Sequence, residues 1–96
     1  MPLVPDQAGP LAQRIAGGHA WADHRDDFPE VESQGEFAAL ILRILVAPSD
    51  ERVLVRNRTA YWDGPSGTIV IVNPGDPDGG ACFRPSDGWA YFERSR

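Results

Sequence analysis

The sequence contains no lysine, and all 9 of its basic residues are arginine. With 14 acidic residues, the chain has a formal net charge of −5 at pH 7. Sequence-independent binding to nucleic acid needs a broad basic surface, so this charge disfavours that mode. A local cleft can still be positive, because the acidic residues crowd into residues 23–36. Four arginines fall instead on expected strands or their ends: Arg52, Arg56, Arg58 and Arg84.

Cysteine is nearly absent. The single Cys82 can form no internal disulfide, so its presence implies no oxidising compartment. One cysteine and two histidines fall short of a zinc set, and no glycine-rich phosphate loop opens a helix after a strand. We therefore expect neither a metal nor a cofactor.

Long apolar runs are also missing. The longest, residues 37–47, is interrupted by Arg43 and is shorter than the roughly 18 residues of a membrane helix. The first residues lack the basic and apolar regions of a signal peptide. We expect no membrane segment and no signal peptide in this chain.

A length of 96 residues suits one domain. Residues 1–10 contain three prolines and a glycine, which favour a flexible leader or a linker stub before a single domain at residues 11–96. Helical spacing begins at Leu11, and the glycine pair at residues 17–18 leaves open one kinked helix or two short ones.

A second helix is the clearest element. Ser33 and Glu36 have the spacing of a capping box, and Pro48 ends the apolar run that follows. The run forms one apolar stripe at Phe37, Leu40, Ile41, Ile44 and Leu45.

After Asp50 the apolar period changes to two, which predicts strands. We expect them at residues 52–56, 59–62, 68–72, 81–84 and 89–93, with a turn at residues 73–80. Short connections make neighbouring strands antiparallel. The predicted fold is therefore α+β, with two N-terminal helices packed on a meander sheet of four to five strands.

The sheet face away from the helices is expected to be an open platform suited to RNA. Arginines would hold phosphate, threonines would donate hydrogen bonds and aromatic rings would stack on bases. A period of two does not say which residues face the core, and aromatic residues on strands are more often buried than exposed. The candidates are Arg56, Arg58, Thr59, Tyr61, Trp62, Thr68, Arg84 and Tyr91.

Both histidines, His19 and His24, lie five residues apart on the expected first helix. Two imidazoles could serve as an acid and a base near neutral pH. The same positions also suit a helix-start residue and an ordinary surface residue, because this spacing does not place them tightly on one helix face.

Several short motifs together resemble the C-terminal toxin domains of bacterial polymorphic and contact-dependent growth inhibition systems. The chain is similar to their small metal-independent ribonucleases, grouped with barnase, EndoU, colicin D, colicin E5 and RelE. Two positions depart from that pattern, Asp23 in place of a basic residue and Ala81 in place of threonine. The motifs are His19-Ala20-Trp21 with His24, and residues 47–49, 57–62, 67–74, 78–80 and 83–85.

The resemblance implies a metal-independent endoribonuclease, with tRNA as a possible substrate. A helix histidine would deprotonate the ribose 2′-hydroxyl or protonate the leaving 5′-oxygen, giving a cyclic phosphate, while sheet residues hold the phosphate. Of the two histidines, His19 is favoured as the catalytic one. The implied catalytic residues are His19, His24, Arg58, Thr59 and Thr68, with Arg56, Tyr61, Arg84 and Tyr91 binding substrate.

The resemblance also implies a biological setting. The domain would be delivered within a larger secreted protein to the cytoplasm of a target bacterium, and would be monomeric except when bound by a cognate immunity protein. An alternative from another class is a non-catalytic acidic binding module, such as an immunity or antitoxin-like protein, with the carboxylates of residues 23–36 as its partner surface. An enzyme acting on a free nucleotide is a third possibility.

Overall fold

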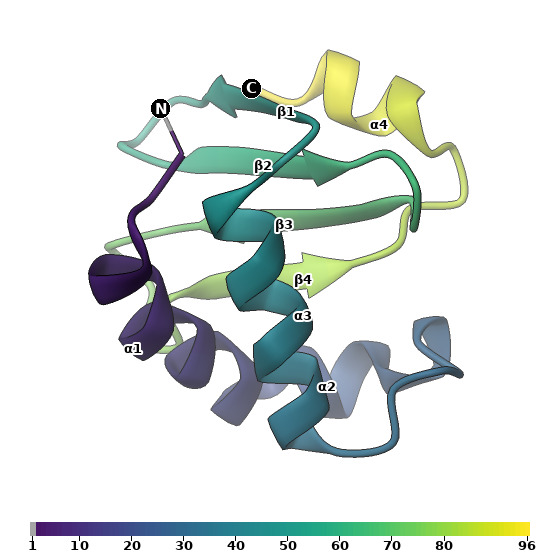
Figure 1. The fold of residues 1–96 in the computed structure, drawn as a ribbon. Coiled ribbons are helices and arrows are strands. Elements are labelled where there is room, and N and C mark those ends of the chain that lie inside the picture. Colours follow the sequence, from purple (N-terminus) through teal and green to yellow (C-terminus); the bar gives the residue numbers. More distant parts are fainter. Residues whose placement is uncertain (1) are drawn as a thin grey trace.

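The computed structural model describes residues 2–96, and its architecture is the predicted α+β fold. The chain begins with three α-helices, α1 (Pro5–Gly17), α2 (His19–His24) and α3 (Gln34–Val46), with a short 3₁₀ turn η1 (Arg25–Asp27) after α2. Four strands follow, β1 (Asp50–Val53), β2 (Thr59–Asp63), β3 (Thr68–Val72) and β4 (Gly80–Phe83), and then helix α4 (Trp89–Arg94). The strands form an antiparallel meander in the order β1-β2-β3-β4 (Figure 1).

Helix α1 begins at Pro5, within the segment that was expected to be a flexible leader. Met1 lies outside the described residues, but Pro5 occupies the first turn of α1 and Ala8 is fully buried. A proline fits there because the first turn has no intrahelical use for its missing N–H. The backbone N–H of Leu3 also donates to the carbonyl of Leu45, so residues 5–10 belong to the packed domain.

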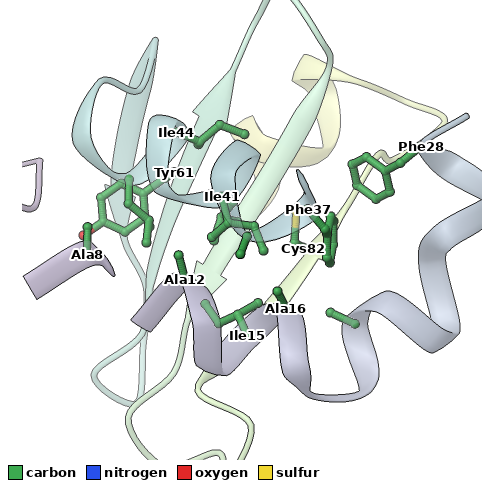
Figure 2. Close-up of a cluster of buried hydrophobic side chains, with 14 residues drawn as sticks. Ala8, Ala12, Ile15, Ala16, Phe28, Phe37, Ile41, Ile44, Tyr61 and Cys82 are labelled. Atoms are coloured by element: carbon green, nitrogen blue, oxygen red, sulfur yellow. The ribbon is translucent and has the colours of Figure 1, made fainter. Parts of the chain in front are cut away.

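The main core lies between the helices and one sheet face (Figure 2). Helix α3 crosses the strands, and α1 packs beside it with small residues that allow a close approach. The predicted N-cap forms, because Ser33 Oγ accepts from the backbone N–H of Glu36 at 3.1 Å. The Glu36 carboxylate reaches one residue further than a capping box requires and accepts from the backbone N–H of Glu32 at 3.4 Å. Buried residues of this core include Ala12, Ile15, Phe37, Ile41, Ile44, Tyr61, Val70 and Cys82.

The opposite sheet face is partly covered, in contrast to the expected open platform. Residues 89–93, predicted as a fifth strand, lie within α4. Trp89 and Phe92 are one helical turn apart and both contact Trp62, with ring centroids at 6.2 and 6.1 Å. A strand would have placed these two rings on opposite sides, so burial on Trp62 favours the helix.

The expected strand at residues 52–56 also ends early, at Val53. Arg56 and Asn57 have φ values of 63° and 61°, the left-handed region. Two successive residues of this kind characterise the tight hairpin turn that matches strand twist. The turn therefore takes Arg56 and Arg58 out of the strands and places them at its corner.

A substitution at Gly80 would test how closely β3 and β4 approach each other. It has φ 148°, and a Cβ there would lie 1.9 Å from the carbonyl oxygen of Ile71. We expect Gly80→Ala to lower the free energy of unfolding by at least about 3 kcal/mol, because the backbone must move or strain. Urea unfolding of the purified variant measures this.

The control is Gly17→Ala, at the last residue of α1, where a Cβ meets nothing within 4 Å. That change should stabilise the protein by about 0.5 to 1 kcal/mol, since alanine restricts the unfolded chain. Equal stability of the Gly80→Ala variant and the parent would contradict the close approach.

Candidate functional site

The candidate site follows helix α2, which packs along the edge strand β4. Gly18 separates α2 from α1 in an extended conformation, so the chain forms two helices and His19 begins the second. His19 and His24 lie at opposite ends of α2, a rise of about 7.5 Å along the axis. Each of them contacts a different carboxylate.

His19 pairs with Asp78, which belongs to the loop before β4. The imidazole Nδ1 hydrogen-bonds to Asp78 Oδ2, and the same oxygen accepts from the backbone N–H of His19 at 3.2 Å. The side chains are 44% and 38% exposed. A neutral imidazole whose Nδ1–H donates to a carboxylate keeps Nε2 as an acceptor, so His19 has the orientation of a general base.

His19 and Asp78 shift each other's pKa in opposite directions. The hydrogen bond to Asp78 raises the pKa of His19 above its usual value, although partial burial opposes the shift. Hydrogen bonds from His19 lower the pKa of Asp78. Asp23 and Asp76 also raise the pKa of His19, so the surroundings of this imidazole are acidic.

At the other end of α2, His24 lies beside Phe83, with ring centroids 5.4 Å apart. Its Nδ1 is 3.8 Å from Asp27 Oδ2. Asp27 also accepts two hydrogen bonds from Arg84. The backbone N–H of Arg84 donates to the Asp27 carboxylate at 3.4 Å, and Nη1 of Arg84 donates to the Asp27 backbone carbonyl at 3.0 Å. Asp27 therefore links His24 to Arg84.

Arg84 is the best-connected arginine among residues 2–96. Its Nε donates to Thr68 Oγ1 at 2.9 Å, and its two terminal nitrogens bind both oxygens of Glu30. The guanidinium also lies 4.4 Å from the ring centroid of Phe28. Hydrogen bonds from Arg84 lower the pKa of Glu30 to about 2. Because the Glu30 carboxylate binds both terminal nitrogens of Arg84, an anion that used these nitrogens would have to displace it.

The hydrogen-bonded cluster continues behind Arg84 into the protein. Thr68 Oγ1 is 2.8 Å from Ser66 Oγ, which donates to the carboxylate of Asp63. Burial alone would raise the pKa of Asp63, but hydrogen bonds from Ser66 and Arg43 outweigh it and the pKa is lowered. These groups fix the β2–β3 turn and hold Arg84 in place.

Several of the predicted site residues do not lie where the sequence analysis expected them. Thr68 is fully buried, so its hydroxyl positions Arg84 and touches no substrate. Tyr61 is 4% exposed in the main core and cannot stack on a base, and Trp62 is buried on the other face. Thr59 begins β2, opposite Val53 and Val72.

The remaining candidates lie apart from α2. Arg58 and Tyr91 line one pocket with α4, and neither histidine lines it. Arg56 is exposed at the β1–β2 turn. The structure thus brings together His24 and Arg84, and separately Arg58 and Tyr91, but not all the predicted site residues.

Sequence reasoning missed the carboxylates that organise the site, namely Asp27, Glu30, Asp63 and Asp78. Asp78 lies 59 residues from His19, and its loop looked only like a turn. Its one local signal is its position directly before two glycines. Gly79 allows Arg14 and Leu11 of α1 to approach, which brings the loop against α1 and α2.

Within residues 2–96 no three metal-binding side chains cluster, and no helix is long and apolar enough to cross a membrane. Burial raises the pKa of Cys82, which leaves this thiol unreactive. No family model matches the chain, and no curated protein matches it.

The His19–Asp78 pair predicts a pH-dependent contribution to stability. His19 has a raised folded pKa, so its stabilisation is complete below about pH 6.5 and is lost as the pH rises through that folded value. Asp78 has a lowered folded pKa, so its contribution is present above about pH 3.8 and is lost as the pH falls through the lowered value.

We therefore expect Asp78→Asn to destabilise the protein more at about pH 5 than at about pH 9, as measured by urea unfolding. Proton NMR should also show the His19 titration moving down towards its ordinary pKa. The matched control Asp6→Asn, an exposed change in α1, should leave that titration where it was. An unchanged His19 titration in the Asp78 variant would show that the pair does not form in solution.

Proposed function

We propose that this protein is a metal-independent endoribonuclease, and that it acts as a toxin domain restrained by an immunity protein. The observation that carries the proposal is the exposed His19 imidazole oriented by Asp78. An oriented histidine with a free Nε2 is suited to remove a proton from a ribose hydroxyl. Attack by the neighbouring 2′-oxygen is intramolecular and needs no added nucleophile.

The chemistry follows from these residues. His19 Nε2 accepts the 2′-hydroxyl proton, the 2′-oxygen forms a bond to phosphorus, and the bond to the 5′-oxygen breaks. Because His24 lies at the other end of α2, solvent returns a proton to that 5′-oxygen. The products are a 2′,3′-cyclic phosphate and a 5′-hydroxyl, while Arg84 beside His24 binds a neighbouring phosphate of the strand.

Cleavage of RNA tests this assignment directly. His19→Ala should lower the cleavage rate at least about 100-fold, because a positioned general base contributes 10² to 10⁴. EDTA should have no effect, and mass spectrometry should detect cyclic phosphate ends. Gln13→Ala, an exposed change on α1, serves as the control and should cleave at the parent rate.

In growing bacteria, induction of the parent chain should arrest growth and induction of the His19→Ala variant should not. Intact tRNA and total RNA after prolonged incubation with parent protein, combined with equal toxicity of the two chains, would exclude the ribonuclease.

Glu30 offers a second test, because substrate phosphate must displace it from Arg84. We expect Glu30→Gln to lower the KM for RNA several-fold while changing kcat little, since it removes a competing charge without touching either histidine. Glu32→Gln is the matched control, an exposed carboxylate two residues away that does not contact Arg84. A KM that rises in Glu30→Gln would show that Glu30 supports substrate binding instead.

The Glu30–Arg84 pair is also the observation that favours the alternative, an acidic binding module. With Arg84 neutralised, the exposed surface over residues 23–36 carries mostly negative charge and would suit a basic partner. If neither the parent nor Glu30→Gln cleaves RNA, and the chain binds a basic partner protein in a salt-dependent way, this second function replaces the first.

A further inference from the structure

A second candidate site lies on the sheet face opposite α1 and α3. A pocket of about 280 Å³ opens between α4 and the corner of the β1–β2 turn. Arg58, Arg94 and Arg96 line it, together with Tyr91 and the apolar Leu54 and Ile71. Its volume is near the lower end of small-molecule sites, which suits a ligand about the size of one nucleotide.

The pocket concentrates positive charge in an acidic chain. Three of the 9 basic residues line it, and no Asp or Glu residue is among its lining residues. Arg58 donates to the backbone carbonyl of Val55 at 3.2 Å. It also donates to the main-chain oxygen of Arg96 at 2.6 Å, and because Arg96 is the last residue of this sequence, a phosphate on Arg58 must displace that terminal carboxylate. Arg94 gives one nitrogen to the carboxylate of Asp87. Guanidinium groups of this kind bind phosphate oxygens in pairs.

An aromatic and apolar wall stands beside these charges. The Tyr91 ring is held edge to face by Phe83, with centroids 5.4 Å apart and planes at 89°. Leu54 and Ile71 belong to the apolar cluster on this sheet face. A bare phosphate would need no such wall, whereas a planar base attached to a phosphate would contact it.

We propose that this pocket binds a nucleotide, with the phosphate on Arg58 and Arg94 and the base against Tyr91. The nucleotide can be free or can be one unit of an RNA strand, because the shared chemistry is the same. The inference does not rest on the proposed ribonuclease activity, since binding here needs neither histidine.

The experiment is an NMR titration of ¹⁵N-labelled full-length protein, carried out with the His19→Ala variant so that no strand is cut. The probes are adenosine monophosphate, adenosine, inorganic phosphate and a trinucleotide with 2′-O-methyl riboses. We expect adenosine monophosphate to shift the amides of Leu54, Ile71 and Tyr91, and to bind at least about tenfold more tightly than adenosine or phosphate. Added salt should weaken the binding.

The trinucleotide identifies the source of the ligand. Binding tenfold tighter than adenosine monophosphate would indicate a strand, and weaker binding would indicate a free nucleotide. Arg58→Gln and Arg94→Gln should each weaken binding about tenfold, as expected for loss of one charge-assisted pair. Arg25→Gln, an arginine on the opposite side that packs on Trp21, should not.

Three results would overturn the proposal. They are shifts confined to α2, adenosine binding as tightly as its monophosphate, and inorganic phosphate binding as tightly as the nucleotide. If Arg58→Gln does not fold, because its bonds hold the hairpin corner, the Arg94 variant and the mapped shifts decide the question. Ribonuclease activity with an empty pocket, or an occupied pocket without activity, would separate this inference from the proposed function.

Discussion

The constraint on which the rest of the structure depends is the burial of both faces of the central strands. On β2 and β3, Tyr61 and Val70 face the helices while Trp62 and Ile69 face α4, and all four are buried. Sheets covered on both faces bring apolar side chains from both layers into contact. Polar chemistry is thereby displaced to the edge strand and to the ends of the sheet.

The positions of the charged groups follow from that constraint. His19 and Asp78 meet at one end of β4, and His24, Asp27 and Arg84 meet at its other end. The arginine pocket lies at the end of the sheet where β1 turns into β2, on the opposite face. A ribonuclease with this fold would bind its substrate along the β4 edge and α2, not across an open sheet.

The sequence predicted local features well where chain-local physics decides them. The N-cap at Ser33 follows from capping preference, the apolar stripe of α3 from its helical period, and three of the strands from their period of two and their turn residues. The helix at residues 89–94 was not predicted, because its alternating aromatic residues also fit a strand. The helix is favoured by Trp62, which contacts both Trp89 and Phe92, and this contact is not visible in the local sequence. The early end of β1 was missed because non-glycine residues at positive φ leave little signal.

The candidate site was predictable only in part, because some of its paired residues lie far apart in the sequence. His19 and His24 are visible as titratable residues, but their carboxylate partners differ in origin. Asp27 is three residues from His24, whereas Asp78 reaches His19 only because the loop between β3 and β4 lies against the start of α2. No spacing rule connects residues 59 positions apart.

Arg84 shows both cases, a functional residue that the sequence suggests and partners that only the structure shows. The sequence suggested an arginine for phosphate, and the structure gives that arginine a rigid support in Thr68 and Phe28 together with a competing carboxylate in Glu30. Glu30 is itself more than half exposed, so it can leave without opening the core. A guanidinium that is preorganised and covered by a displaceable anion selects ligands that carry enough negative charge to replace it. A polyanionic strand meets that condition more readily than a single weak anion, and this is why we propose RNA as the ligand of this edge of the sheet.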